Sequence, residues 1–123
     1  MTQPLPPNTA VWFEIPVADM ARAKSFYAAV VGGALKDEDG GSNPMAAFPA
    51  AGDASVSGHL YPGKPAPSGT GITIHLAVDD VEKAMARVSA HGGQVVSPVI
   101  DIPAGRFSYC LDPDGNSFGV FSR

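Results

Sequence analysis

An internal repeat limits the folds open to this chain more than any other feature of the sequence. The apolar run that begins at Val11 aligns with the run that begins at Ile72, at an offset of 61 residues. Three apolar pairs, an aspartate pair and a glycine pair then align in order: Phe13 with Ile74, Ile15 with Leu76, Val17 with Val78, Asp19 with Asp80, and Gly32 with Gly93. This self-similarity predicts two copies of one supersecondary unit.

Each copy predicts the element order βαβββ. It begins with apolar and polar residues in alternation, which is typical of a strand, and continues with apolar residues at helical spacing. An aspartate precedes each predicted helix, where an N-cap belongs, and a glycine pair follows it, where a left-handed C-cap belongs. Three β-like segments come after each helix: residues 34–36, 45–49 and 54–61 in the first half, and 94–100, 106–111 and 117–122 in the second. We therefore expect an α+β fold.

The repeat also predicts the domain organisation. We expect modules at residues 10–61 and 70–123, joined by a linker at 62–69 that is rich in proline and glycine. Because a module of about 55 residues can bury little apolar surface alone, the two should pack as a single domain. Residues 1–9 contain three prolines and little to bury, which favours a flexible arm. Pro16 cannot donate to a strand ladder, so the first strand should lie at a sheet edge or carry a bulge.

Composition excludes several classes of partner. Only 16% of the 123 residues are charged, and 12 acidic residues outnumber 8 basic ones without a basic cluster, so we expect no nucleic-acid partner. Neither an apolar run near the roughly 18 residues of a membrane span nor a signal peptide is evident, so we expect no membrane partner. The single cysteine, Cys110, has no internal disulfide partner and reads as a small buried residue. A cytoplasmic location fits these features.

Two polar residues at equivalent repeat positions are candidates for chemistry. Alternation places Trp12 and Glu14 on the strand face opposite the apolar wall, and Thr73 and His75 on the corresponding face of the second copy. A carboxylate beside an imidazole can act as an acid–base pair, so Glu14 and His75 are the candidate catalytic residues. The alternative is that the two side chains hydrogen-bond across the module seam only to satisfy buried polar groups.

The same face suggests a binding pocket. Trp12 would provide a rigid aromatic wall, and Gly58 and Gly119 would leave space opposite it. Arg106 could reach an acidic ligand. If Gly58 faces the pocket, alternation turns His59 away from it unless a β-bulge intervenes. Further side chains on the faces of the two glycines could complete the walls: Leu60 and Phe121. The alternative fills this space with the same side chains as core.

Three segments resemble the vicinal oxygen chelate superfamily, which includes glyoxalase I, bleomycin resistance proteins, extradiol dioxygenases and fosfomycin resistance enzymes. They are Val17-Ala-Asp-Met-Ala-Arg-Ala-Lys-Ser-Phe-Tyr, Ala77-Val-Asp-Asp-Val-Glu-Lys-Ala and Leu111-Asp-Pro-Asp-Gly-Asn-Ser-Phe-Gly-Val. The resemblance runs from Ala10 to Ser122. It implies a glyoxalase-like fold, in which paired βαβββ modules form a cupped, partly open barrel around a cleft, and it implies a homodimer.

The resemblance also implies where a metal would bind. Enzymes of this superfamily hold a divalent metal with four histidine or glutamate side chains, two from each module. The corresponding positions in this sequence are Trp12, Thr73, Gly119 and, by subtraction of the repeat offset, Gly58. None of these residues supplies the imidazole, thiolate or carboxylate that a transition metal prefers. We therefore expect no metal cofactor, unless a divalent ion occupies a non-standard site.

Three functions remain open from the sequence. The first is binding of a small apolar or aromatic molecule in the cleft without the usual metal, as in the sequestration by the bleomycin resistance proteins that the chain resembles. The second is an enzyme, a lyase, isomerase or dioxygenase, which uses metal-free chemistry of Glu14 and His75 or a metal set that adds His59 to them. The third is a homodimeric structural or interaction protein without a ligand.

Overall fold

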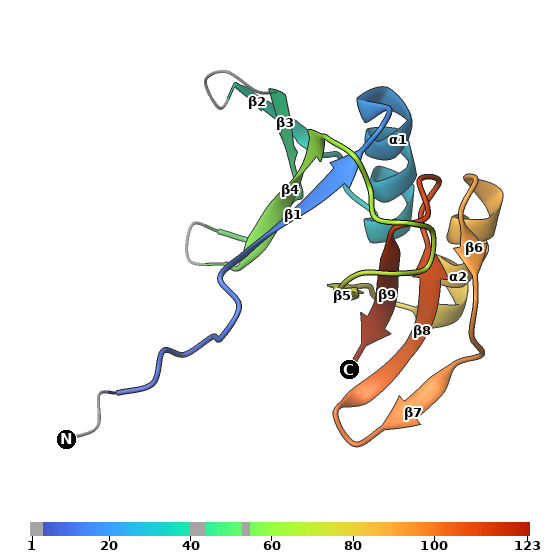
Figure 1. Cartoon of the computed structure of the whole chain (residues 1–123). Helices are drawn as coiled ribbons and strands as arrows, with labels where there is room; N and C mark the ends of the chain where they lie inside the picture. Colours follow the sequence, from blue (N-terminus) through green and yellow to red (C-terminus); the bar gives the residue numbers. More distant parts are fainter. Residues whose placement is uncertain (1–3, 40–43, 53–54) are drawn as a thin grey trace.

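The structure is a computed structural model that describes residues 4–39, 44–52 and 55–123. It contains two sheets and two helices (Figure 1). The first module comprises β1 (Trp12–Val17), α1 (Met20–Val31), β2 (Lys36–Asp39), β3 (Pro44–Ala47) and β4 (Ser57–Pro62). The second comprises β5 (Ile74–Ala77), α2 (Val81–Ala90), β6 (Gln94–Val95), β7 (Ile100–Ile102), β8 (Gly105–Leu111) and β9 (Ser117–Ser122). The α+β class and the repeated module are confirmed.

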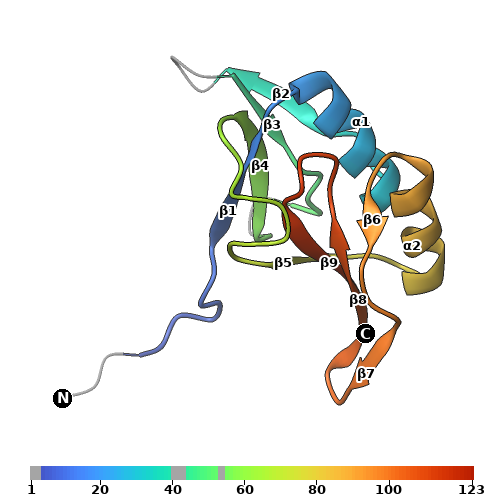
Figure 2. The same ribbon diagram turned by 45° about the vertical axis from the view of Figure 1, so that its right-hand side comes forward.

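The two sheets have the same strand order. In the first sheet the order is β1-β4-β3-β2, and in the second it is β5-β9-β8-β6, with β7 also paired to β8. The first strand of each module runs parallel to the last one, β1 to β4 and β5 to β9. The sheets lie apart in Figure 1, and the two helices pack against each other on one side of the molecule in Figure 2. Within the described residues the sheets do not close into a barrel.

Pro16 lies on an edge strand, as its missing N–H predicts. The N–H of Gly63 donates to the carbonyl of Val17 at 3.1 Å, so the backbone of Val17 points towards β4. Because successive residues of a strand point in opposite directions, the backbone of Pro16 points to the free edge of the sheet. There its carbonyl accepts a hydrogen bond of 2.8 Å from the Asn116 side chain. The proline therefore removes no donor that β4 requires.

The core lies between the helices and the inner faces of the sheets. Asp19 and Asp80 cap their helices, accepting from the N–H of Arg22 at 3.0 Å and of Lys83 at 2.9 Å. Gly32 ends α1 in the left-handed conformation with a φ of 77°. The fully buried side chains of the core come from both modules: Val17, Phe26, Tyr27, Val30, Leu60, Val81, Val88, Cys110, Phe118 and Val120. Burial raises the pKa of the Cys110 thiol to about 11, so this cysteine is an unreactive core residue, as expected.

A buried hydrogen-bond network joins the two modules. The hydroxyl of Tyr27 in α1 donates to Oδ2 of Asp112 at 2.6 Å, and the amide of Asn116 donates to the same oxygen at 3.0 Å. Burial, with the negative charge of Asp112, raises the pKa of Tyr27 well above its usual range, so the phenol stays protonated and donates. Since Asn116 also donates to Pro16, the turn of the second module is tied to α1 and β1 of the first.

Two predicted strands differ from the observed ones. The segment 94–100 is divided into β6 and β7, because Pro98 cannot donate to a ladder and the Ser97 hydroxyl accepts the N–H of Tyr109 at 2.9 Å instead. The first strand after α1 is not 34–36 but β2, whose charged sequence Lys-Asp-Glu-Asp suits the outer edge of a sheet. Part of the predicted strand 54–61 lies outside the described residues. In the described chain, neither helix is long and apolar enough to cross a membrane.

Candidate binding cleft

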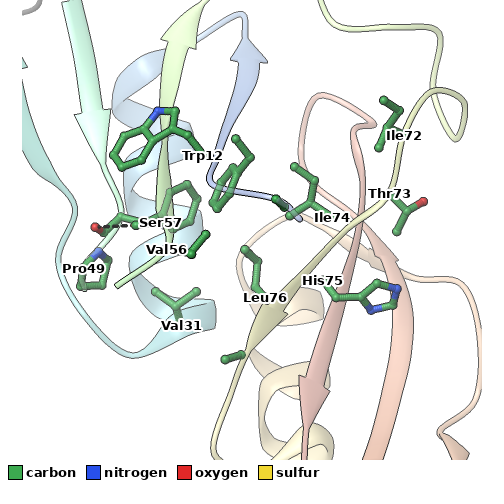
Figure 3. A pocket seen from close by; sticks show the side chains of 14 residues that line it. Trp12, Val31, Pro49, Val56, Ser57, Ile72, Thr73, Ile74, His75 and Leu76 are labelled. Carbon is green, nitrogen blue, oxygen red and sulfur yellow. Dashed lines mark hydrogen bonds between the residues drawn. The ribbon is translucent and has the colours of Figure 1, made fainter. Parts of the chain in front are cut away.

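An apolar cavity of about 680 Å³ lies between the two modules. We call it the intermodule cavity. Its walls come from β1, the start of β4 and the residues that lead into and form β5 (Figure 3). Apolar side chains form most of the lining: Trp12, Phe13, Val56, Ile72, Ile74 and Leu76. A cavity of this size and composition is typical of small-molecule sites.

The rim of the intermodule cavity exposes large apolar side chains. Trp12 is 49% exposed, Val56 is 45% exposed and Ile72 is 87% exposed. Trp12 comes from the first strand of one module, and Ile72 precedes the first strand of the other. Apolar side chains gathered around a cavity mouth indicate a surface that binds a ligand or another protein.

Three side chains in contact, Trp12, His59 and Glu14, lie across β1 and β4 beside this cavity. Trp12 Nε1 donates to His59 Nδ1 at 2.8 Å, and His59 Nε2 lies 3.2 Å from Glu14 Oε1. An indole N–H can only donate, so Nδ1 of His59 must be the acceptor. The proton of the neutral imidazole therefore sits on Nε2, the nitrogen that lies beside Glu14. His59 is buried, and the side chain of Glu14 is 64% exposed.

The strand register corrects the predicted position of Gly58. Glu14 lies opposite His59, and its repeat counterpart His75 lies opposite Gly119. His59 is therefore the counterpart of Gly119, because the segment between β1 and β4 is one residue longer than that between β5 and β9. Gly58 pairs with Phe13, and a Cβ at Gly58 would meet the carbonyl and ring of Phe13 in the core. It leaves no space opposite Trp12.

An aromatic platform covers the matching face of the second sheet. We use this name for His75, Phe107, Tyr109 and Phe121. The His75 ring lies 5.0 Å from that of Phe107 and 5.8 Å from that of Phe121, centroid to centroid. Gly119 permits this arrangement, because a Cβ there would meet the imidazole. Partial desolvation against the neighbouring rings lowers the pKa of His75, which favours the neutral ring at pH 7.

The structure does not bring the two candidate catalytic residues together. Glu14 contacts His59, and His75 packs against the aromatic platform of the other sheet. In Figure 3 the His75 ring points away from Trp12. The ionisable side chains in contact are therefore Glu14 and His59. The catalytic roles predicted for Glu14 and His75 stay predictions.

The other predicted cleft residues occupy varied places. Thr73 lines the intermodule cavity, with its hydroxyl 2.6 Å from that of Ser117. Leu60 is fully buried in the core on the helix side of β4, so it forms no cleft wall. Arg106 donates to both carboxylate oxygens of Glu82 at 3.0 and 2.8 Å and to Asp101 at 3.1 Å. The guanidinium of Arg106 therefore already donates to two carboxylates of this chain. The predicted contact of Arg106 with an acidic ligand stays a prediction.

The sequence did not predict the aromatic residues whose rings contact those of Phe121 and His59. Phe107 and Tyr109 alternate along β8 on the face of Phe121, with which Phe107 is stacked at an angle of 6°. Tyr61 lies beside His59, with 6.2 Å between ring centroids. The sequence feature that could have identified them is the spacing of aromatic rings at every second residue within a strand. Such residues lie on the same face of the strand, and the strand pairing then shows which rings meet.

The residues at the family's four metal positions do not fit a divalent metal. With the corrected register these positions hold Trp12, His59, Thr73 and Gly119. Only His59 has a nitrogen suited to a metal, and its two nitrogens are engaged by Trp12 and Glu14. A zinc-type site needs three or four such ligands. The part of the chain that the structure describes also contains no cluster of three or more His, Cys, Asp or Glu side chains placed to bind an ion.

Comparisons with known proteins identify the family of this chain. Residues 9–120 match the family model described as Glyoxalase/Bleomycin resistance protein/Dioxygenase superfamily. The Mycobacterium tuberculosis protein named "Putative glyoxylase CFP32" is 32% identical over 93% of this chain and 45% of its own length. The "Anthracycline biosynthesis protein DnrV" of Streptomyces peucetius is 28% identical over 95% of this chain and 48% of its own. This chain thus spans about half the length of these curated relatives.

Solved structures share the fold over nearly the whole chain. TnmS3, described as an antibiotic binding protein from Streptomyces sp. CB03234, superposes with a TM-score of 0.64 and 28% sequence identity. The match covers 94% of this chain and 95% of that one. The two-module arrangement of this chain therefore matches that of a solved protein over nearly the full length of both chains.

Proposed function

Because this chain belongs to the glyoxalase/bleomycin resistance protein/dioxygenase superfamily, we propose that it binds a small, largely apolar or aromatic molecule between its modules without a metal ion. The observation that carries this proposal is the intermodule cavity, with the half-exposed Trp12 in its wall. An indole face provides a large apolar contact at low cost in side-chain entropy. The metal-free part of the proposal rests on the donor chemistry of the four positions, of which three offer no suitable ligand atom.

The similarity to TnmS3 supports a binding role. That protein is described as binding an antibiotic, and the two chains align almost from end to end. Binding of a small molecule is also consistent with the aromatic platform, which leaves Tyr109 and His75 exposed on the second sheet. A cytoplasmic location, expected from the sequence, stays a prediction.

We further propose that the protein acts as a homodimer in which a second copy covers the free edges of the sheets. β1 and β5 each lie at a sheet edge, and their outward backbone groups have no strand partner within the described residues. Exposed edges with apolar neighbours invite pairing with another chain. The apolar rim of the intermodule cavity lies between these two strands, so a second copy would also complete its walls.

Catalysis without a metal is the second candidate, favoured by the contact between His59 and Glu14. Nε2 of His59 lies 3.2 Å from Oε1 of Glu14, and a carboxylate placed beside an imidazole can accept a proton from a bound compound. If the protein converts a bound compound, and the Glu14→Gln variant still binds that compound without converting it, the result would support metal-free catalysis. A chain that binds no compound at all would support the third possibility, an interaction protein.

The single tryptophan of the chain lies in the cavity wall, which makes the proposal directly testable. We expect planar aromatic compounds to quench the fluorescence of Trp12 in a saturable manner, with one site per chain. Replacement of Trp12 by alanine should weaken binding, measured by calorimetry, about tenfold or more, since a central aromatic contact dominates such sites. Val96→Ala removes an exposed apolar side chain of the second module and serves as the control. Equal affinities of Trp12→Ala and the unmodified protein would contradict the proposal.

A further inference from the structure

A second cavity, of about 400 Å³, adjoins the intermodule cavity and has Glu14 in its wall. We call it the Glu14 cavity. It lies between β1, residue 66 of the linker, residues 70–72 and the start of β9. Trp12 lines both cavities, so one molecule seated against the indole can reach Glu14. Among the described residues that line the Glu14 cavity, Glu14 is the one with an ionisable side chain.

Glu14 keeps its negative charge available to a ligand. Its neighbour His59 is neutral, since Trp12 holds Nδ1 as an acceptor and the single ring proton lies on Nε2. Nε2 of His59 lies 3.2 Å from Oε1 of Glu14, and the neutral ring supplies no opposing charge. The side chain of Glu14 is 64% exposed, and none of the lysine or arginine ion pairs among the described residues involves it.

Several cations of the described residues form ion pairs with carboxylates other than Glu14. Arg22 pairs with Asp114 at 2.9 Å, Arg106 pairs with Glu82, and Lys24 pairs with Asp37 at 2.6 Å. The chain as a whole carries a net charge of −4. The electrostatic field around Glu14 therefore favours a positively charged group.

An aromatic face beside a carboxylate is the arrangement that recognises an ammonium group. The ring quadrupole of tryptophan attracts a cation that lies over its face, and the carboxylate provides the opposite charge. Trp12 and Glu14 project from the same side of β1, and Tyr61 adds a further ring next to His59. Resting on the function proposed above, we propose that the ligand is an arylalkylamine, which places its ammonium group on Glu14 and its aromatic body against Trp12.

Three naphthalene compounds that differ in one substituent test this proposal. They are 1-naphthylmethylamine, 1-naphthalenemethanol and 1-naphthoate, which are positive, neutral and negative at pH 7. We expect calorimetry to give an affinity for the amine about tenfold above that for the alcohol, with the carboxylate weakest. Glu14→Gln should abolish the difference between amine and alcohol and leave the alcohol's affinity unchanged. Raised salt should weaken the binding of the amine alone.

Glu38→Gln is the matched control, because it makes the same substitution at an exposed position of the outer edge strand β2. It should keep the preference for the amine. Equal affinities of the unmodified protein for amine and alcohol, with saturable quenching of Trp12 by both, would overturn the ammonium site and leave the proposed aromatic binding intact. Failure of all three compounds to bind would overturn both proposals. Because the comparison of the three compounds uses the unmodified protein, its outcome does not depend on the folding of a variant.

Discussion

Replacing Asp112 with alanine should lower the free energy of unfolding by roughly 2–4 kcal/mol, because it leaves several buried donors without an acceptor. The hydroxyl of Tyr27 is fully buried and donates to Oδ2, and the backbone N–H groups of Asp114 and Asn116 donate to Oδ1 at 2.9 Å each. The loss is a large fraction of the stability of an ordinary domain. Urea unfolding followed by circular dichroism measures it.

A surface carboxylate provides the control for this prediction. The side chain of Asp101 is 74% exposed and contacts the half-exposed guanidinium of Arg106, so Asp101→Ala should cost less than about 1 kcal/mol. A double-mutant cycle identifies the mechanism: Tyr27→Phe should destabilise the unmodified protein clearly and the Asp112→Ala variant much less. Equal stability of Asp112→Ala and Asp101→Ala would show that the network does not hold the modules together.

Gly58→Ala should destabilise the protein by roughly 1–3 kcal/mol, because the added methyl group has no space. A Cβ at this position meets both the backbone carbonyl and the ring of Phe13, and β4 is held on both sides, by β1 and by β3. Neither strand can retreat without loss of ladder hydrogen bonds. Denaturant unfolding measures the effect, and we expect the cooperativity of the transition to be unchanged.

This substitution also tests the corrected strand facing. If Gly58 lay in the open cleft, as subtraction of the repeat offset predicts, alanine would fit there and stability would change little. Gly52→Ala is the matched control, because a Cβ at Gly52 meets nothing within 4 Å. That variant should be neutral or slightly more stable, as the unfolded chain loses freedom. A Gly58→Ala variant as stable as Gly52→Ala would contradict the register of β1 and β4.

The sequence predicts the local structure well because local physics determines it. The caps at Asp19 and Asp80 depend on groups three residues away, and the buried faces of β1 and β5 depend on alternation alone. The repeat adds the order of the elements, and the edge position of β1 comes from Pro16. These features require no knowledge of distant contacts.

The site is less predictable because it depends on pairing between distant segments. The segment between β1 and β4 is one residue longer than that between β5 and β9, so the residue on the cleft face of β4 is His59 and not Gly58. A shift of one residue turns a side chain to the other face of the sheet. The pairing of Glu14 with His59 rather than His75 follows from that register. Likewise, Arg106 is held by Glu82 of α2, a contact that tertiary packing alone creates.

The central claim is that the cleft of this protein binds its ligand without the metal of its family. Calorimetric titration of an aromatic ligand such as 1-naphthylmethylamine, before and after removal of divalent ions with a chelator, tests it most directly. We expect the same dissociation constant and one site per chain in both titrations, and no gain when Zn²⁺, Ni²⁺ or Mn²⁺ is added back. Loss of binding on chelation, restored by one of these ions, would contradict the claim.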